Sequence, residues 1–197
     1  MGKEAQVRAA FADGTDEGRL QLEPPRLVFR GAQRRVWQGA ALAGVRADQG
    51  DLVLADGARF SLGERQAIAW AEAILRPKGR VEKIGVKAGM RAAILGVDDP
   101  DLAAELAAAG AILTHERRDL DLLFYAADST DQLSRLGEIL PALAERGALW
   151  IASRKGKAAT VRDLDVMAAA KACGLVDNKV VGFSVTHTAL RLVRRRT

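Results

Sequence analysis

The chain has 197 residues, 49% of them hydrophobic and 28% charged, and its formal net charge is +5. These values predict one or two globular domains with a sizeable core, and no apolar run reaches the roughly 18 residues of a membrane-spanning helix. The single cysteine, Cys173, excludes an internal disulfide and a multi-cysteine metal site. The first residues lack the apolar stretch of a signal peptide, so we expect a cytoplasmic protein that does not bind membranes.

Short strands and then one helix are predicted for the first 76 residues. Glycines and the Asp56-Gly57 pair, a strong hairpin signal, separate the strand-like runs. The predicted strands are residues 6–11, 19–22, 26–30, 34–38, 42–47, 51–55 and 58–62. A helix is predicted to begin at Glu64, because apolar residues recur there every three or four positions, and Pro77 ends it.

This order of elements resembles that of the pleckstrin-homology-like superfold. In such a barrel the C-terminal helix closes one corner, and Trp70 stands where the helix should pack into the barrel. We therefore predict an N-terminal all-β pleckstrin-homology-like barrel with a C-terminal helix for residues 1–76. Residues 13–17 form the first hairpin loop and include three acidic residues, which would repel a phosphoinositide headgroup.

A basic, glycine-rich linker is predicted for residues 77–89, and strands then alternate with helices. The strands are residues 91–97, 111–115, 121–126 and 148–152, the helices 101–109, 130–146 and 162–173, and the final hairpin 179–185 with 189–194. Runs such as residues 122–127 are apolar on both faces, as in a buried parallel strand. We therefore predict a shortened, methyltransferase-like Rossmann domain over residues 90–197 that ends in an antiparallel hairpin.

The turn after the first of these strands is acidic rather than glycine-rich. Asp98 and Asp99 stand where a nucleotide-binding fold presents backbone N–H groups to a phosphate. We expect the two aspartates to cap the following helix and to complement its dipole. In addition, only residues 116–120 separate the second strand from the third, so at least one strand–helix unit of a full Rossmann fold is absent.

Three stretches of the second half together resemble a known family. They are residues 83–91 (KIGVKAGMR), 147–155 (GALWIASRK) and 174–180 (GLVDNKV). They are similar to the bacterial family known as domain of unknown function 3052, and the similarity covers about residues 83–195. The resemblance implies a small, incomplete methyltransferase-like fold and no assigned activity. Family members tend to carry an acidic residue and a tryptophan around the final turn, where this chain has Ser184, Val185 and His187.

One candidate binding loop follows the last parallel strand. Ser153, Arg154, Lys155 and Lys157 surround a glycine there, at the strand end where open α/β sheets bind ligands, and their hydroxyl and cations suit an oxyanion. A solvated, flexible loop explains the same residues. Glu116 follows the second strand and either binds a ribose or pairs with the neighbouring arginines.

The remaining candidates are weaker. Asp177, Asn178 and Lys179 form a turn that opens the hairpin, and Lys179 either pairs with Asp177 or reaches a nearby loop. Nothing in the sequence pairs His115 with His187, so no metal site or catalytic residue is predicted. Cys173 is expected to be a buried structural thiol.

Three functions follow from these observations. The first is a non-catalytic interaction or regulatory module with a protein partner and no cofactor. The second is an enzyme or sensor for a nucleotide or an S-adenosylmethionine-like ligand, bound by Glu116, Ser153, Arg154 and Lys155. The third is weak nucleic-acid binding through the C-terminal arginines, which supply four of the chain's positive charges: Arg191, Arg194, Arg195 and Arg196.

Overall fold

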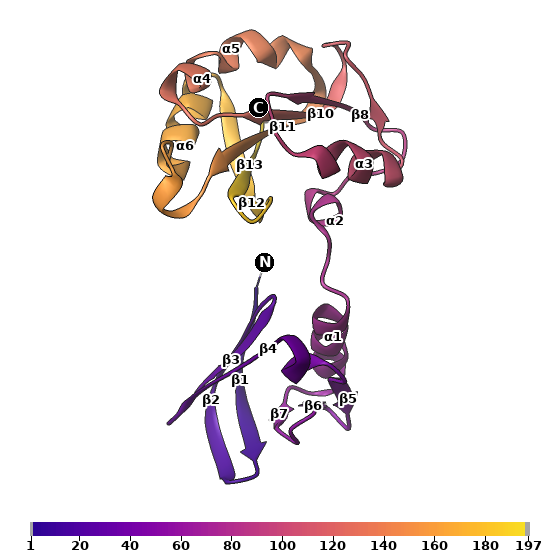
Figure 1. Cartoon of the computed structure of the whole chain (residues 1–197), viewed down its shortest axis with the longest axis vertical. Coiled ribbons are helices and arrows are strands. Elements are labelled where there is room, and N and C mark those ends of the chain that lie inside the picture. The colour runs from indigo at the N-terminus through magenta and orange to yellow at the C-terminus, as the bar shows by residue number, and fades with distance from the viewer. Residues whose placement is uncertain (1, 196–197) are drawn as a thin grey trace. The chain divides into compact units, whose positions relative to one another are not determined.

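A computed structural model describes residues 2–195 (Figure 1). The chain divides into two compact units, of which the first ends at Lys78 and the second begins at Gly79. Within the described range, no helix is both long enough and apolar enough to cross a membrane.

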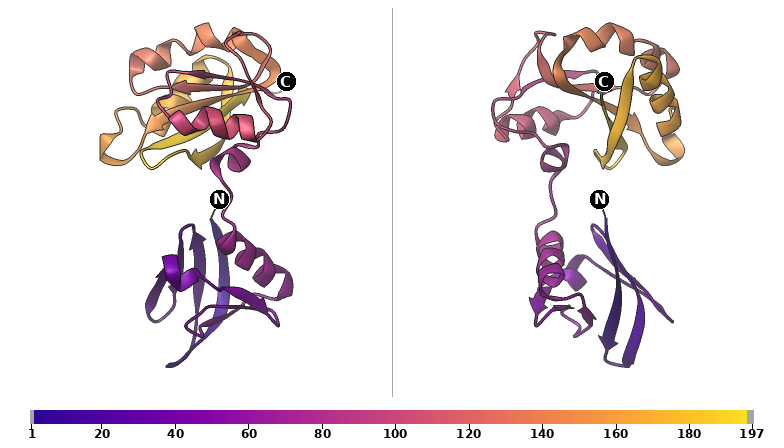
Figure 2. Two further views of the ribbon diagram at one scale, coloured as in Figure 1. Left: turned by 45° about the vertical axis from the view of Figure 1, so that its right-hand side comes forward. Right: turned by 180° about the vertical axis from the view of Figure 1, so that it is seen from behind.

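The first unit is built on one curled antiparallel sheet of seven strands (Figure 2). The strands are β1 (Lys3–Phe11), β2 (Gly14–Glu23), β3 (Arg26–Arg30), β4 (Arg34–Gln38), β5 (Arg46–Asp48), β6 (Asp51–Val53) and β7 (Arg59–Ser61), in the order β4-β3-β2-β1-β7-β6-β5. In β2, Gly18, Leu20 and Leu22 are buried and the residues between them are at least partly exposed, which is the alternation of a sheet with one covered face. The helix α1 (Glu64–Leu75) covers that face with Ala67, Trp70 and Ala71.

The predicted fold class, a pleckstrin-homology-like barrel followed by a Rossmann domain, was wrong. The seven strands form an open sheet in which β4 and β5 are the two edges, and no hydrogen-bonded ladder joins these edges within residues 2–195. The two halves of the sheet meet between β1 and β7, where only Ala9 and Ala10 have partners. The order of strands and helix is compatible with several architectures, because it does not determine which edges pair.

The second unit is an α/β structure with a six-stranded sheet. Its elements are α2 (Arg80–Ile84), β8 (Arg91–Leu95), α3 (Pro100–Ala108), β9 (Ile112–Leu113), β10 (Leu120–Ala126), α4 (Thr130–Ser134), α5 (Leu136–Ile139), β11 (Leu143–Arg154), α6 (Asp163–Ala172), β12 (Leu175–Gly182) and β13 (His187–Arg194). The strand order is β12-β13-β11-β10-β8-β9. The strands from β9 to β11 are parallel, and β13 and β12 complete the sheet as the predicted antiparallel hairpin.

Helices cover both faces of this sheet, so the unit has three layers (Figure 1). On one face, α4, α5 and α6 bury apolar side chains such as Leu133, Leu136 and Val166 against Leu149 and Ile151. On the other face, α2 and α3 bury Ile84, Leu102 and Leu106 together with Phe124 and Trp150. The central strands are apolar on both sides because each side meets a layer of helices.

Three predicted elements of this unit differ from the structure. The helix predicted over residues 130–146 is two short helices, divided at Arg135, and a 3-10 turn that contains Pro141, and β11 begins at Leu143. The predicted linker contains α2, whose five residues are too few to show a helical period. Asp177–Lys179, predicted to be a turn, lies inside β12 at a register shift, which accommodates the turn-favouring residues as a β-bulge.

We predict that Gly147→Ala destabilises the fold. A Cβ atom at Gly147 would lie 2.4 Å from the carbonyl oxygen of Leu120, where the pairing of β10 with β11 is irregular. Moving backbone to relieve this clash costs about 1–3 kcal/mol, which thermal unfolding detects as a lower melting temperature. Gly137→Ala is the matched control: it adds a methyl group that meets nothing within 4 Å, so its melting temperature should be unchanged or slightly raised. Equal melting temperatures for the two variants would contradict this account of β11.

Candidate functional site

A pocket of about 240 Å³ lies at the carboxyl ends of the parallel strands β8, β10 and β11. The chain leaves β8 toward β9 on one side, whereas β10 pairs with β8 on the other side. Open α/β sheets bind ligands at such a reversal of strand order. The pocket is lined by Gly96, Val97, Asp98, Asp99, Ala126, Asp128, Ala152, Arg154, Phe183, Thr186 and His187.

Asp99 caps the N-terminus of α3, as the sequence predicted, whereas Asp98, which was also expected to cap this helix, lies before the cap. The Oδ1 atom of Asp99 accepts hydrogen bonds from the backbone N–H groups of Asp101 at 3.2 Å and Leu102 at 3.1 Å. In a phosphate-binding turn these N–H groups would face the ligand. Here a carboxylate already satisfies them, so the helix end offers no site for a phosphate.

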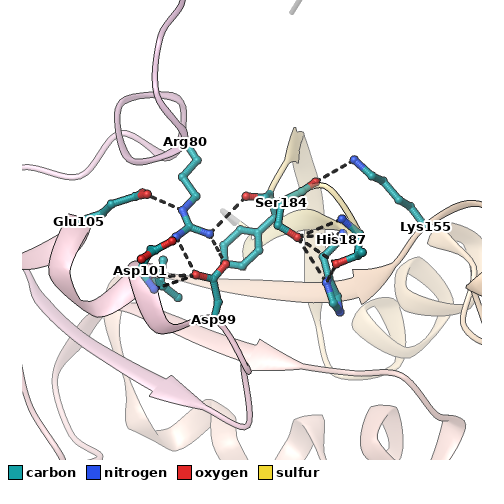
Figure 3. A network of polar contacts seen from close by, with 10 residues as sticks. Arg80, Asp99, Asp101, Glu105, Lys155, Ser184 and His187 are labelled. Carbon is teal, nitrogen blue, oxygen red and sulfur yellow. Dashed lines mark hydrogen bonds and ion pairs between the residues drawn. The ribbon is translucent and has the colours of Figure 1, made fainter.

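Arg80 binds to the other side of the Asp99 carboxylate (Figure 3). Both terminal nitrogens of Arg80 donate to Asp99, one of them at 2.9 Å, while Nε donates to Glu105 at 2.7 Å. The guanidinium also donates to the carbonyl oxygen of Phe183 at 3.4 Å and stacks 5.0 Å from the centre of that ring. Only 11% of the Arg80 side chain and 14% of the Asp99 side chain are exposed, so water screens this pair weakly.

The ion pair changes the acidity of both partners. Hydrogen bonds from Arg80 hold the pKa of Asp99 below its ordinary value, and burial opposes them. Conversely, the hydrogen bond to Asp99 raises the pKa of Arg80, with a smaller contribution from Glu105. Both groups are therefore charged at neutral pH, and the pair joins α2 to the N-terminus of α3.

A second group of contacts shapes the loop between β12 and β13, which borders the pocket (Figure 3). Ser184 Oγ accepts hydrogen bonds from the backbone N–H groups of Thr186 at 3.3 Å and His187 at 3.1 Å. The His187 Nδ1 atom lies 2.8 Å from Thr186 Oγ1. Lys155 Nζ donates to the carbonyl oxygen of Ser184 at 2.8 Å. Lys155 therefore fastens this loop to the end of β11.

Asp128, which follows β10, also lines the pocket. Its carboxylate accepts the backbone N–H of Arg154 at 3.1 Å and the Arg154 Nε at 3.4 Å. Its own backbone carbonyl accepts a hydrogen bond from the Thr160 hydroxyl. Asp128 thus holds the side chain of Arg154, which is 53% exposed and lines the pocket.

The structure brings only part of the predicted binding loop to this pocket. Arg154 lines it, and Lys155 contacts the loop that closes it. Ser153 is 2% exposed inside β11 and cannot meet a ligand. Lys157 is exposed and does not line it, and Glu116 pairs with Arg91 at 3.2 Å and with Arg118 at 3.5 Å.

Asp177, Asn178 and Lys179 lie elsewhere, in β12. The Asn178 amide oxygen accepts a hydrogen bond from Arg191 at 3.1 Å, and Lys179 Nζ donates to the carbonyl oxygen of Lys83 at 2.5 Å. Asn178 lines a separate cleft of about 820 Å³ beside the start of β11. Within the described residues, no group of three or more His, Cys, Asp or Glu side chains could hold a metal ion.

Sequence reasoning missed Arg80 and Asp128. The partners of Arg80 stand 19, 25 and 103 residues further along the chain, and no local pattern connects them. Asp128 was detectable, because it is the first charged residue after the apolar strand β10, and polar residues at such strand ends gather at one edge of a parallel sheet.

These features define a Rossmann-like α/β protein with an acidic pocket at the carboxyl ends of its strands. The family described as "Protein of unknown function (DUF3052)" matches residues 81–196. Because the match covers more than half of the chain, this protein belongs to that family, as the three sequence stretches predicted. No curated protein matches its sequence.

Several solved structures with a similar chain path are described as methyltransferases. Magnesium protoporphyrin IX methyltransferase from Synechocystis, with bound SAM, is 13% identical, with 58% of this chain and 74% of that chain covered and a TM-score of 0.47. A SAM-dependent O-methyltransferase from Thermotoga maritima is 10% identical, with 98% and 94% covered and a TM-score of 0.44. A protein described as a putative Zn-dependent alcohol dehydrogenase from Rhodobacter sphaeroides is 11% identical, with 61% and 92% covered and a TM-score of 0.46. All three TM-scores lie below 0.5.

We predict that Asp99→Asn destabilises the protein by about 1–2 kcal/mol at pH 7, because it removes a charge-assisted pair with Arg80. Asparagine still caps a helix, so Asp99→Ala should cost about 1 kcal/mol more. Chemical denaturation of the three proteins measures both differences.

The same pair gives a pH dependence. Since the pKa of Asp99 is lowered in the folded state, the pair stabilises the fold above the unfolded-state pKa of about 4. That stabilisation is lost as the pH falls through the lower folded-state pKa. The difference between wild type and Asp99→Asn should therefore shrink below about pH 4, and a difference that stays constant to pH 2 would contradict the ion pair.

Proposed function

We propose that this protein is a ligand-responsive regulatory module whose pocket binds a positively charged nucleoside of the S-adenosylmethionine kind without transforming it. The observation that carries this proposal is the acidic turn at the end of β8. Asp98 and Asp99 stand where a phosphate-binding fold has glycines, and Asp99 takes the N–H groups of the α3 terminus.

The charge of the pocket favours a cation over a phosphate. Three carboxylates line it, those of Asp98, Asp99 and Asp128, against the single guanidinium of Arg154. Asp99 and Asp128 are each paired with an arginine. Asp98 is exposed and has no ion pair among residues 2–195, so its charge acts on an incoming ligand. A dinucleotide or nucleoside triphosphate would bring like charge to this carboxylate.

The size of the pocket favours binding of one end of such a ligand. Pockets that enclose a drug-sized molecule span about 300–1,000 Å³, whereas this pocket has about 240 Å³. S-adenosylmethionine carries a sulfonium, an ammonium and a carboxylate at its methionine end, which is therefore positively charged overall, and a neutral adenosine at the other end. The charged end is the part that complements Asp98.

The arrangement of the pocket's acids supports regulation rather than chemistry. The carboxylates of Asp99 and Asp128 already accept hydrogen bonds from arginines and backbone N–H groups, so neither is placed as a general base. Asp99 also contacts Arg80, which stands two residues after the boundary between the compact units. A ligand that changes the contacts of Asp99 would thereby alter the position of Arg80 at the start of the second unit. A protein partner and a cytoplasmic location stay predictions.

Calorimetric titration tests the proposed ligand class. S-adenosylmethionine should bind at least about fivefold more tightly than S-adenosylhomocysteine, which lacks the sulfonium charge, because one charge near an exposed carboxylate contributes about 1 kcal/mol. ATP in excess should not displace bound S-adenosylmethionine, because its phosphates would meet the carboxylate of Asp98 in this pocket. Displacement by ATP, or no binding of S-adenosylmethionine, would contradict the proposal.

A pair of aspartate variants tests the assigned site. Asp98→Asn should remove most of the preference for S-adenosylmethionine over S-adenosylhomocysteine. Asp101→Asn is the matched control, because Asp101 is an exposed acid in the first turn of the same helix and does not line the pocket. The site assignment fails if both variants lose the preference equally. Conversion of S-adenosylmethionine during a long incubation would overturn the non-catalytic role.

A further inference from the structure

A basic cleft lies away from the acidic pocket, beside the start of β11. It has a volume of about 820 Å³, and its charged lining residues are Glu145, Arg146, Arg191, Arg194 and Arg195. Four guanidinium groups thus face one carboxylate, a net charge of +3. Its uncharged lining residues are Gly147 of β11 and Val176, Asn178 and Val193 of the β12–β13 hairpin.

Arg191 is the half-buried cation of this cleft. It lies opposite Trp150 in the register of β11 with β13, and Trp150 is fully buried. Burial lowers the pKa of Arg191, and no carboxylate among the described residues pairs with it. Its one recorded side-chain partner is the neutral amide oxygen of Asn178, at 3.1 Å. A partly buried guanidinium without a counter-charge is costly unless an anion from outside completes it.

The other arginines of the cleft have different roles. Arg194 donates to the backbone carbonyl oxygens of Leu140, Leu143 and Ala144, so its hydrogen bonds serve the fold. Arg146 and Arg195 are exposed and form no ion pair within residues 2–195, even though Glu145 lines the same cleft. Together with Arg191 they leave three guanidinium groups available to a ligand.

From this geometry we infer that the cleft of Arg146, Arg191 and Arg195 is a binding site for phosphate groups. Guanidinium groups bind phosphate oxygens in a bidentate manner, and three of them suit a ligand with more than one phosphate. A polynucleotide and a free nucleotide both present this chemistry. The site is independent of the proposed pocket at the other end of β11.

Fluorescence anisotropy with a labelled twelve-nucleotide single-stranded DNA, competed with ATP and with inorganic phosphate, tests this inference on the full chain. If the ligand is a polynucleotide, the DNA binds more tightly than ATP, and log affinity falls against log salt with a slope of about −2 for three neutralised phosphates. If the ligand is a free nucleotide, ATP binds at least as tightly as the DNA. Either result supports a phosphate site in the cleft. The inference is overturned if neither the DNA, ATP nor inorganic phosphate binds at low salt.

Charge-removing variants locate the site. Arg191→Gln and Arg146→Gln should each weaken binding of the probe that wild type binds more tightly by at least about fivefold. If that probe is the DNA, each variant should also make the slope of log affinity against log salt shallower by about 0.7. Arg117→Gln is the matched control, because it removes the same charge from an exposed position of the same unit that does not line the cleft. Arg146 is exposed, so its variant keeps the test valid if Arg191→Gln fails to fold. Equal losses in Arg146→Gln and Arg117→Gln would overturn the site.

Discussion

The second unit depends on one buried guanidinium. Arg80 contacts Asp99 and Glu105 of the α3 segment and Phe183 of the loop before β13, so three parts of the chain that are distant in sequence meet at a single side chain. Because Asp99 also caps α3, the same carboxylate serves the helix end and the ion pair. Arg80 therefore holds Asp99 in place at the pocket, and the neighbouring residue Asp98 remains available to a ligand.

The sheet separates charge along β11. At the carboxyl end of this strand, Arg154 meets Asp128 in a pocket lined by three carboxylates. Near its beginning, Arg146 and Gly147 border a cleft with a net charge of +3. The formal net charge of +5 gives no sign of this division. A cationic ligand at one end and a phosphate at the other are the partners that this distribution favours.

The sequence predicted those parts of the structure that rest on local chemistry. The Asp99 cap, the buried parallel strand over β10 and the final hairpin all follow from neighbouring residues. The predicted long helix failed because the gain from pairing Leu143 with Leu120 across the sheet outweighs helical propensity after Pro141. The barrel failed for a similar reason, since strand order along the chain leaves the pairing of the sheet edges undetermined.

The candidate site was predicted less well than the fold. Arg154 and Lys155 stand near the pocket because both follow the last parallel strand. Ser153 belongs to the same stretch, but the pleat of β11 places it among buried residues. Arg80 could not be found from sequence, since an arginine in a basic, glycine-rich stretch shows no sign of its distant partners.

The most direct test of the account is a titration of the isotopically labelled protein with S-adenosylmethionine, followed by backbone amide NMR. The account predicts that the amide signals of Gly96, Asp98, Asp128 and His187, all of which line the pocket, shift with ligand concentration. The amides of Arg146 and Asn178, in the basic cleft, should stay in place. Unchanged pocket signals, or shifts confined to the cleft, would contradict the assignment of the pocket as the binding site.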